Sequence, residues 1–170
     1  MSITDNLGIG AEEPYQRQMT SYRRTRSAIL EATKVVISSH GVRSASMIEI
    51  ADNAQVSRAT LYNHFRDKES VLRALIEFEI AQLFDGTRSL DQIALAISAD
   101  SALAQMRRSD GAILANLASE VGDPLWALAR SALLTLLGEP VRVELALRWL
   151  LGQVFAPLAP DAVKEQAAAI

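Results

Sequence analysis

Apolar residues recur every three or four positions along most of the chain, a spacing typical of amphipathic α-helices. Between residues 21 and 39, this spacing places Ile29, Ala32, Val36 and Ile37 on one face. Windows further along the chain repeat the pattern. The pattern therefore predicts an all-α protein.

Helix boundary signals divide the first half of the chain into four helices. Gly41 is suited to the left-handed position after the first helix, which we expect over residues 21–39. Ser46 is an N-cap for the second helix, and Glu49, three residues later, completes a capping box. Ser57 and Asp67 are N-caps for the third and fourth helices. Within the second helix we expect inward-facing side chains at Ile48, Ile50, Ala51 and Ala54.

The second half contains further helical segments separated by Gly, Asp and Pro. Asp123 is a cap and Pro124 a first-turn residue after one such break. We predict helices over 68–84, 90–107 with a bend near 99–101, 110–119, 124–137 and 141–155, and a short one after Pro160.

These elements predict an N-terminal three-helix helix-turn-helix domain, joined through a fourth helix to a C-terminal helical domain. Residues 1–20 lack periodicity and contain Gly8, Gly10 and Pro14, so we expect a flexible arm there. The helix-turn-helix domain would cover residues 21–73, and the C-terminal domain would cover 74–170.

Composition and charge support this division. Apolar residues make up 49% of the chain and aromatic residues 5%, with five prolines, which favours helices. The net charge is −3, but residues 15–73 carry a net +5 and residues 74–170 a net −5. A basic N-terminal half beside an acidic C-terminal half is the charge distribution expected of a nucleic-acid reader with a separate second domain.

Several classes of function are disfavoured. Both histidines, His40 and His64, fall in the basic half, and no Ser-His-Asp set, phosphate loop or metal-ligand spacing is present. We therefore expect no enzyme activity, metal or cofactor. The chain lacks cysteine, a signal peptide and an uninterrupted apolar span. These absences lead us to expect a cytoplasmic protein that does not insert into a membrane.

The third helix, residues 58–65, has a narrow apolar stripe and an otherwise polar surface. Only Leu61 and Phe65 form the stripe. A short polar helix held by its neighbours is suited to enter the major groove of DNA. Base edges would be read by Arg58, Ala59 and Asn63. Phosphates would be contacted by Ser57, Thr60, Tyr62, His64 and Lys68, with Arg43 and Ser46 nearby.

Residues from about 23 to 76 resemble the DNA-binding domain of the TetR family of bacterial transcriptional regulators. The resemblance rests on ILEATKVVISSHG over 29–41, S-x-x-x-I-A over 46–51, V-S-x-x-T-L-Y-x-H-F over 56–65, and Lys68, Glu69 and Leu72. It implies that Thr60, Tyr62, His64 and Lys68 contact the DNA backbone. Gln55 and Ala59 depart from the pattern, since the family often has glycine at both positions.

The last helices are apolar on more than one face, which predicts a second partner surface. A homodimer would supply it, and the alternative is that other helices of the same chain cover these faces. The candidate interface residues are Leu125, Leu128, Leu136, Leu145, Trp149 and Leu150. The resemblance also implies a pocket for a small apolar or amphipathic effector, although the same residues can be plain core. The candidate lining residues are Phe78, Ile97, Met106, Leu117, Trp126 and Arg130.

The resemblance implies a homodimeric transcriptional regulator, a repressor that binds a palindromic double-stranded DNA operator and is released by the effector. One alternative is a helical interaction protein whose DNA reading is weakened. Another is a constitutive DNA binder without a ligand.

Overall fold

The computed structural model describes the backbone of residues 12–119 and 124–170, and the side chains from residue 16 onward. All regular secondary structure in these ranges is helical, which confirms the predicted all-α class. The helices are α1 Glu12–Ser44, α2 Met47–Asn53, α3 Arg58–His64, α4 Lys68–Leu83, α5 Leu90–Ala99, α6 Ser101–Ser109, α7 Gly111–Ser119, α8 Pro124–Leu137, α9 Pro140–Phe155 and α10 Pro160–Ala169.

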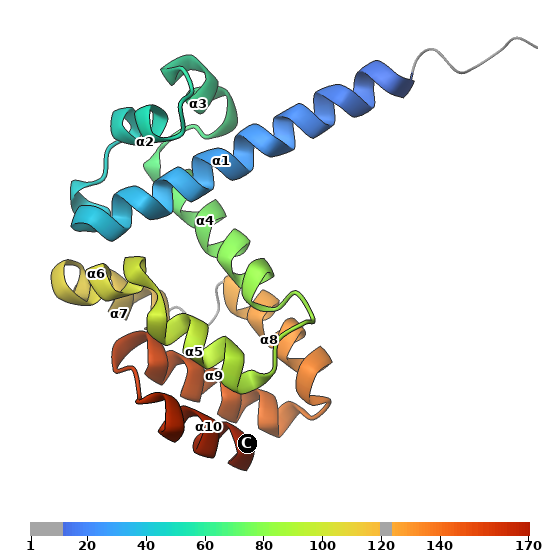
Figure 1. Cartoon of the computed structure of the whole chain (residues 1–170), viewed down its shortest axis with the longest axis vertical. Coiled ribbons are helices and arrows are strands. Elements are labelled where there is room, and N and C mark those ends of the chain that lie inside the picture. Colours follow the sequence, from blue (N-terminus) through green and yellow to red (C-terminus); the bar gives the residue numbers. More distant parts are fainter. Residues whose placement is uncertain (1–11, 120–123) are drawn as a thin grey trace, which may run out of the picture.

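The helices form two connected groups (Figure 1). Helices α2 and α3 lie on one side of the long α1, and α4 leads from them toward the other end of the molecule. Helices α5, α8, α9 and α10 pack together at that far end, where their apolar side chains share one core. The first core joins α1–α4 with Ala102, Met106 and Leu114 of α6 and α7. Helices α6 and α7 therefore pack on the N-terminal helices, and the expected boundary at residues 73–74 falls inside α4.

The expectation of a flexible arm over residues 1–20 is wrong for residues 12–20, which form the start of α1. Pro14 does not prevent this, because first-turn N–H groups have no partner within a helix. This part of α1 extends from the body and needs no apolar face (Figure 1). Residues 1–11 lie outside the described part of the chain, as does the predicted cap Asp123.

The starts of α2, α3 and α4 agree with the boundary signals, whereas α1 runs to Ser44, past a non-helical Gly41, and does not end at residue 39. Ser46, Ser57 and Asp67 each accept a hydrogen bond from the third residue of the helix that follows. The predicted capping box at Ser46 is incomplete, because the Glu49 carboxylate pairs with the His40 ring at 3.0 Å. The inward placement of Ile48 was wrong: it is 46% exposed, whereas Ile50 and Ala51 are fully buried.

No helix in the described ranges is long and apolar enough to cross a membrane.

Candidate nucleic-acid interface and ligand cavity

The turn between α2 and α3 caps the C-terminus of α2 through a residue with left-handed backbone. Gln55 has φ +55°, so the backbone is left-handed at the position where the sequence lacks the usual glycine. The N–H of Gln55 donates to the Asp52 carbonyl, and the N–H of Val56 donates to the Ala51 carbonyl. These two bonds define the Schellman motif, which satisfies the last carbonyls of α2 and fixes the direction in which α3 starts.

Helix α3 presents its polar face to solvent. Leu61 is fully buried and anchors the helix, while the Tyr62 side chain is 53% exposed. The Ser57 hydroxyl accepts from the Thr60 N–H and bonds the Thr60 hydroxyl at 2.8 Å. The structure leaves Ser57, Arg58, Ala59 and Asn63 exposed and Thr60 partly so. The predicted reading residues thus share one accessible helix, and their contacts with DNA remain a prediction.

The end of α3 is held by α1. The rings of His64 and Tyr22 lie 4.2 Å apart, and the Arg26 guanidinium lies 4.5 Å from the centre of the Phe65 ring. The buried His64 Nδ1 has no hydrogen-bond partner among the described residues. Burial, and then the positive charge of Arg26, lower the pKa of His64. A neutral, stacked His64 supports the orientation of α3, a role that the sequence pattern did not reveal.

The amine of Lys68, which was expected to be free to contact a phosphate, is bonded within the protein. Its Nζ donates to the carbonyls of Val42, Arg43 and Ala45 at 3.0, 3.3 and 2.9 Å. These bonds connect the start of α4 to the segment that follows Gly41. The other flanking candidates, Arg43 and Ser46, are exposed beside α2.

A cavity of about 460 Å³ lies between the two helix groups. Ile97, Met106, Leu117 and Trp126 line it, as expected for the effector pocket, whereas Phe78 and Arg130 do not. Phe78 packs against the first core, and Arg130 pairs with Glu144 at 2.6 Å. The indole N–H of Trp126 donates to the Leu117 carbonyl, so the tryptophan offers the cavity mainly its apolar surface.

Charged groups border the cavity where α1, α4 and the α5–α6 corner meet. Lys34 Nζ lies 2.6 Å from Glu79 and 2.7 Å from Asp100, and all three line the cavity. Burial alone would lower the pKa of Lys34, but the hydrogen bonds and negative charges of Asp100 and Glu79 outweigh it and raise the pKa. This amine therefore stays protonated and paired.

The six candidate interface residues fall into different environments. Leu125 and Leu150 are buried and line the cavity, so they are corrected to interior positions. Trp149 is partly covered, and its indole N–H donates to Gln166 of α10 at 2.7 Å. Leu128, Leu136 and Leu145 are exposed. The periodicity missed this distinction because an all-round apolar helix does not indicate which side faces its own core.

No group of three His, Asp or Glu residues in the described ranges lies close enough together to hold a metal ion.

A capped helix-turn-helix, mounted on a long first helix and followed by a helical bundle, is the arrangement of a helix-turn-helix domain joined to a second helical domain. Residues 29–75 match the family described as "Bacterial regulatory proteins, tetR family". Over these residues the match confirms the likeness to the TetR family that the sequence motifs predicted.

Individual relatives match over about a third of this chain. The chain is 40% identical to the HTH-type transcriptional regulator UidR of Escherichia coli K12 over 57 residues, which are 34% of this chain and 29% of UidR. It is 36% identical over 58 residues to the HTH-type transcriptional regulator BetI of Pectobacterium carotovorum, 34% of this chain and 30% of BetI. The match thus spans less than a third of the length of these relatives.

A crystal structure of a putative TetR-family transcriptional regulator from Mesorhizobium loti is similar with a TM-score of 0.49 and 19% identity. The similarity covers 87% of this chain and 93% of that one.

Proposed function

We propose that this chain is a homodimeric transcriptional repressor that binds a palindromic DNA operator through α3. The observation that carries the proposal is the exposed polar face of α3 on a helix-turn-helix fixed at both ends. Arg58, Ala59 and Asn63 would read base edges, and Ser57, Thr60 and Tyr62 would contact phosphates. The TetR-family match over residues 29–75 supports DNA binding by this domain.

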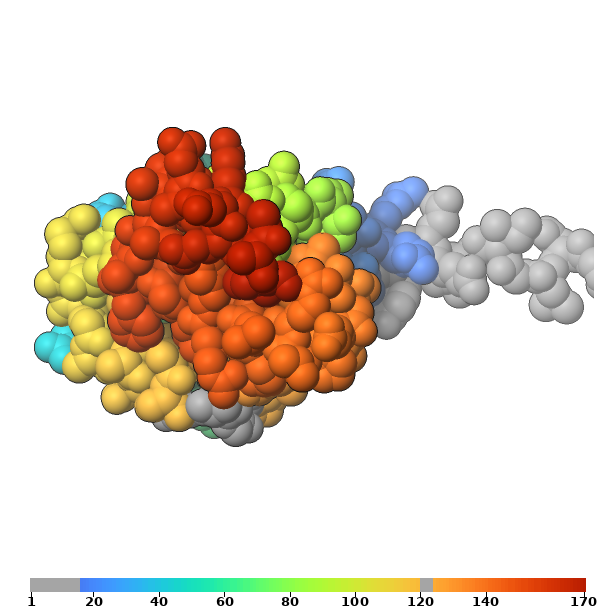
Figure 2. All heavy atoms as spheres, turned by 90° about the horizontal axis from the view of Figure 1, so that it is seen from below, coloured from blue at the N-terminus to red at the C-terminus, as the bar shows by residue number. Residues whose placement is uncertain are grey.

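The apolar surface of α8 and α9 supports a dimer. Leu128, Leu134, Leu136, Val141 and Leu145 are large apolar residues that stay exposed in the single chain. Figure 2 looks onto the face that α8, α9 and α10 form, and shows a broad part of α8 and α9 open beside α10. A group of exposed apolar side chains marks a site of association. A two-fold dimer would bring two reading helices to the two halves of a palindrome.

The cavity supports an effector of mainly apolar chemistry. Its volume falls within the range of about 300–1,000 Å³ usual for small-molecule sites. Its walls are apolar except where Lys34, Glu69, Arg73, Glu79 and Asp100 lie. An apolar body with a polar group at this charged border would fit. The effector would release DNA by favouring one arrangement of the reading helices over another.

The first test is selection of fragmented genomic DNA by the purified chain, followed by sequencing. Enrichment of inverted repeats is expected for a dimeric regulator. Absence of enrichment at moderate salt would instead favour the interaction protein with weakened DNA reading.

On a selected fragment, Tyr62→Ala should weaken binding by more than about tenfold, because it removes an exposed aromatic hydroxyl beside the phosphates. Circular dichroism should show unchanged helicity. Val35→Ala, which shortens a comparably exposed side chain on α1, is the control and should leave the affinity unchanged. An affinity of Tyr62→Ala equal to that of the unaltered chain would contradict the contact.

A further inference from the structure

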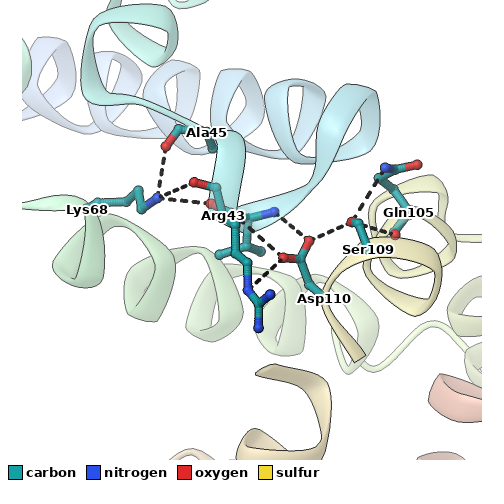
Figure 3. Close-up of polar contacts among 7 residues, drawn as sticks. Arg43, Ala45, Lys68, Gln105, Ser109 and Asp110 are labelled. Carbon is teal, nitrogen blue, oxygen red and sulfur yellow. Dashed lines mark hydrogen bonds and ion pairs between the residues drawn. The ribbon is translucent and has the colours of Figure 1, made fainter. Parts of the chain in front are cut away.

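The segment after Gly41 is hydrogen-bonded from two directions (Figure 3). On one side, the N–H groups of Val42 and Arg43 donate to the Asp110 carboxylate at 2.9 and 3.3 Å. On the other side, three carbonyls of residues 42–45 accept from Lys68, as described above. Asp110 lies between α6 and α7, and Lys68 begins α4. This short segment is therefore the point at which three elements meet.

Asp110 is a buried carboxylate devoted to this contact. It is 1% exposed and accepts a third bond, from the Ser109 hydroxyl, at 2.8 Å. The Arg43 guanidinium is 3.9 Å away. Burial alone would raise the pKa of Asp110, but the bonds from Ser109, Val42 and Arg43, and the charge of Arg43, lower it instead. A buried charge is tolerated only when it is hydrogen-bonded, so the position of Asp110 is closely tied to that of its two amide donors.

Gly41 permits this close approach. Its φ of +89° with ψ of 172° belongs to a region that essentially only glycine adopts. A Cβ at Gly41 would lie 2.3 Å from an Asp110 carboxylate oxygen and 2.4 Å from the Ser109 hydroxyl oxygen. The backbone of α1 therefore rests directly on the α6–α7 junction.

Residues on both sides of this contact also form the cavity wall. Met106, whose carbonyl accepts from the Asp110 N–H, lines the cavity, as does Val42, which donates to Asp110. Ile113 and Leu114, whose N–H groups donate to the Asp110 carbonyl, line it too. A change in the cavity wall is thus one helical turn or less from the carboxylate.

We propose that Asp110 is the positioning residue that couples occupancy of the cavity to the orientation of α3. A filled cavity displaces the α6–α7 junction, Asp110 carries the segment 42–45 with it, and Lys68 transfers the displacement to the start of α4, next to α3. The inference rests on the proposed function. Its physical requirement is an element whose arrangement both sites bias, and in this proposal that element is the segment 42–45, held by Asp110 and Lys68.

The test is a double-mutant cycle that needs no identified effector. Ala129→Phe, on α8 away from the α1–α6 contact, adds a ring to the cavity in place of a ligand. Asp110→Asn keeps the size of the side chain but replaces one acceptor oxygen with a donor, so it cannot accept from both amides. The dissociation constant for a selected DNA fragment is measured for both single variants, the double variant and the unaltered chain.

Ala129→Phe should change the dissociation constant at least fivefold in the unaltered chain and less than twofold with Asp110→Asn. The matched control is Asp161→Asn, an exposed carboxylate on α10, which should leave the fivefold effect intact. An equal effect of Ala129→Phe in both backgrounds, or no effect in the unaltered chain, would overturn the coupling. If Asp110 had only a structural role, its replacement would lower stability or affinity. It would not change the factor by which Ala129→Phe alters the dissociation constant.

If Asp110→Asn does not fold, Ser109→Ala replaces it and removes only one donor to the carboxylate. The effect of Ala129→Phe should then be reduced at least twofold, and an undiminished effect would overturn the proposal. Failure of the unaltered chain to select any DNA would be a different result, because it would remove the proposed function itself.

Discussion

Two glycines show that the absence of a Cβ can be required at one position and can cost stability at another. Gly41 has a positive φ and faces the Asp110 carboxylate, so its missing Cβ is required. Gly152 lies within α9, and a Cβ there would meet no atom within 4 Å. Glycine in a helix interior costs stability relative to alanine, because it loses more conformational freedom on folding.

Gly41→Ala should lower the free energy of unfolding by about 1–3 kcal/mol from the backbone conformation alone, with the steric contact adding to this. Gly152→Ala should raise it by about 0.5–1 kcal/mol. Urea unfolding followed by circular dichroism measures both. Equal effects of the two substitutions would show that the Asp110 contact does not constrain the backbone at Gly41.

At the scale of elements, α4 is fixed at its start by two separate sets of hydrogen bonds. Asp67 and Ser70 form a reciprocal capping box at the N-terminus of α4. The hydrogen bonds of Lys68 to the three carbonyls then attach this helix to the end of α1. Hydrogen bonds that involve a charged group each contribute more than neutral ones, so this lysine has a structural role beside any contact with DNA.

Lys68→Met should lower the free energy of unfolding by about 1–3 kcal/mol, because it removes the charged donor and leaves the carbonyls without it. Lys164→Met, at an exposed position on α10, is the control and should have little effect. The salt dependence of DNA binding by Lys68→Met gives a separate readout. The slope of the logarithm of the binding constant against the logarithm of the salt concentration could decrease by about 1 while stability stays unchanged. That result would mean that Lys68 contacts a phosphate and has no structural role.

At the scale of the whole molecule, the proposed dimer depends on the outer surface of α8 and α9. Leu145 is 55% exposed and faces away from the second core, while its neighbours Ala146 and Leu147 are buried in it. Trp149, by contrast, packs near α10 and is a poor probe of association because replacing it would disturb the monomer.

Leu145→Glu should convert a dimer to a monomer in sedimentation velocity, since a buried charge at an apolar interface is costly. Ile48→Glu changes an equally apolar and comparably exposed residue on α2, so it should leave the dimer intact. Dimers that survive Leu145→Glu would exclude this surface as the interface.

Local signals in the sequence determined the helices and the helix-turn-helix. Caps such as Ser57 and Asp67 act over three residues, so neighbouring residues suffice to predict them. The same local pattern identified α3 as the polar helix of the group, and the family match agrees with it.

Only the tertiary structure decided which distant residues meet. Asp110 reads as an ordinary helix-junction acid, yet its carboxylate binds amides 67 and 68 residues earlier in the chain. Leu125 and Leu145 have the same character in the sequence, but one lies in the cavity wall and the other faces solvent. Helical periodicity identifies an apolar face, whereas the partner of that face follows from how all the helices pack together.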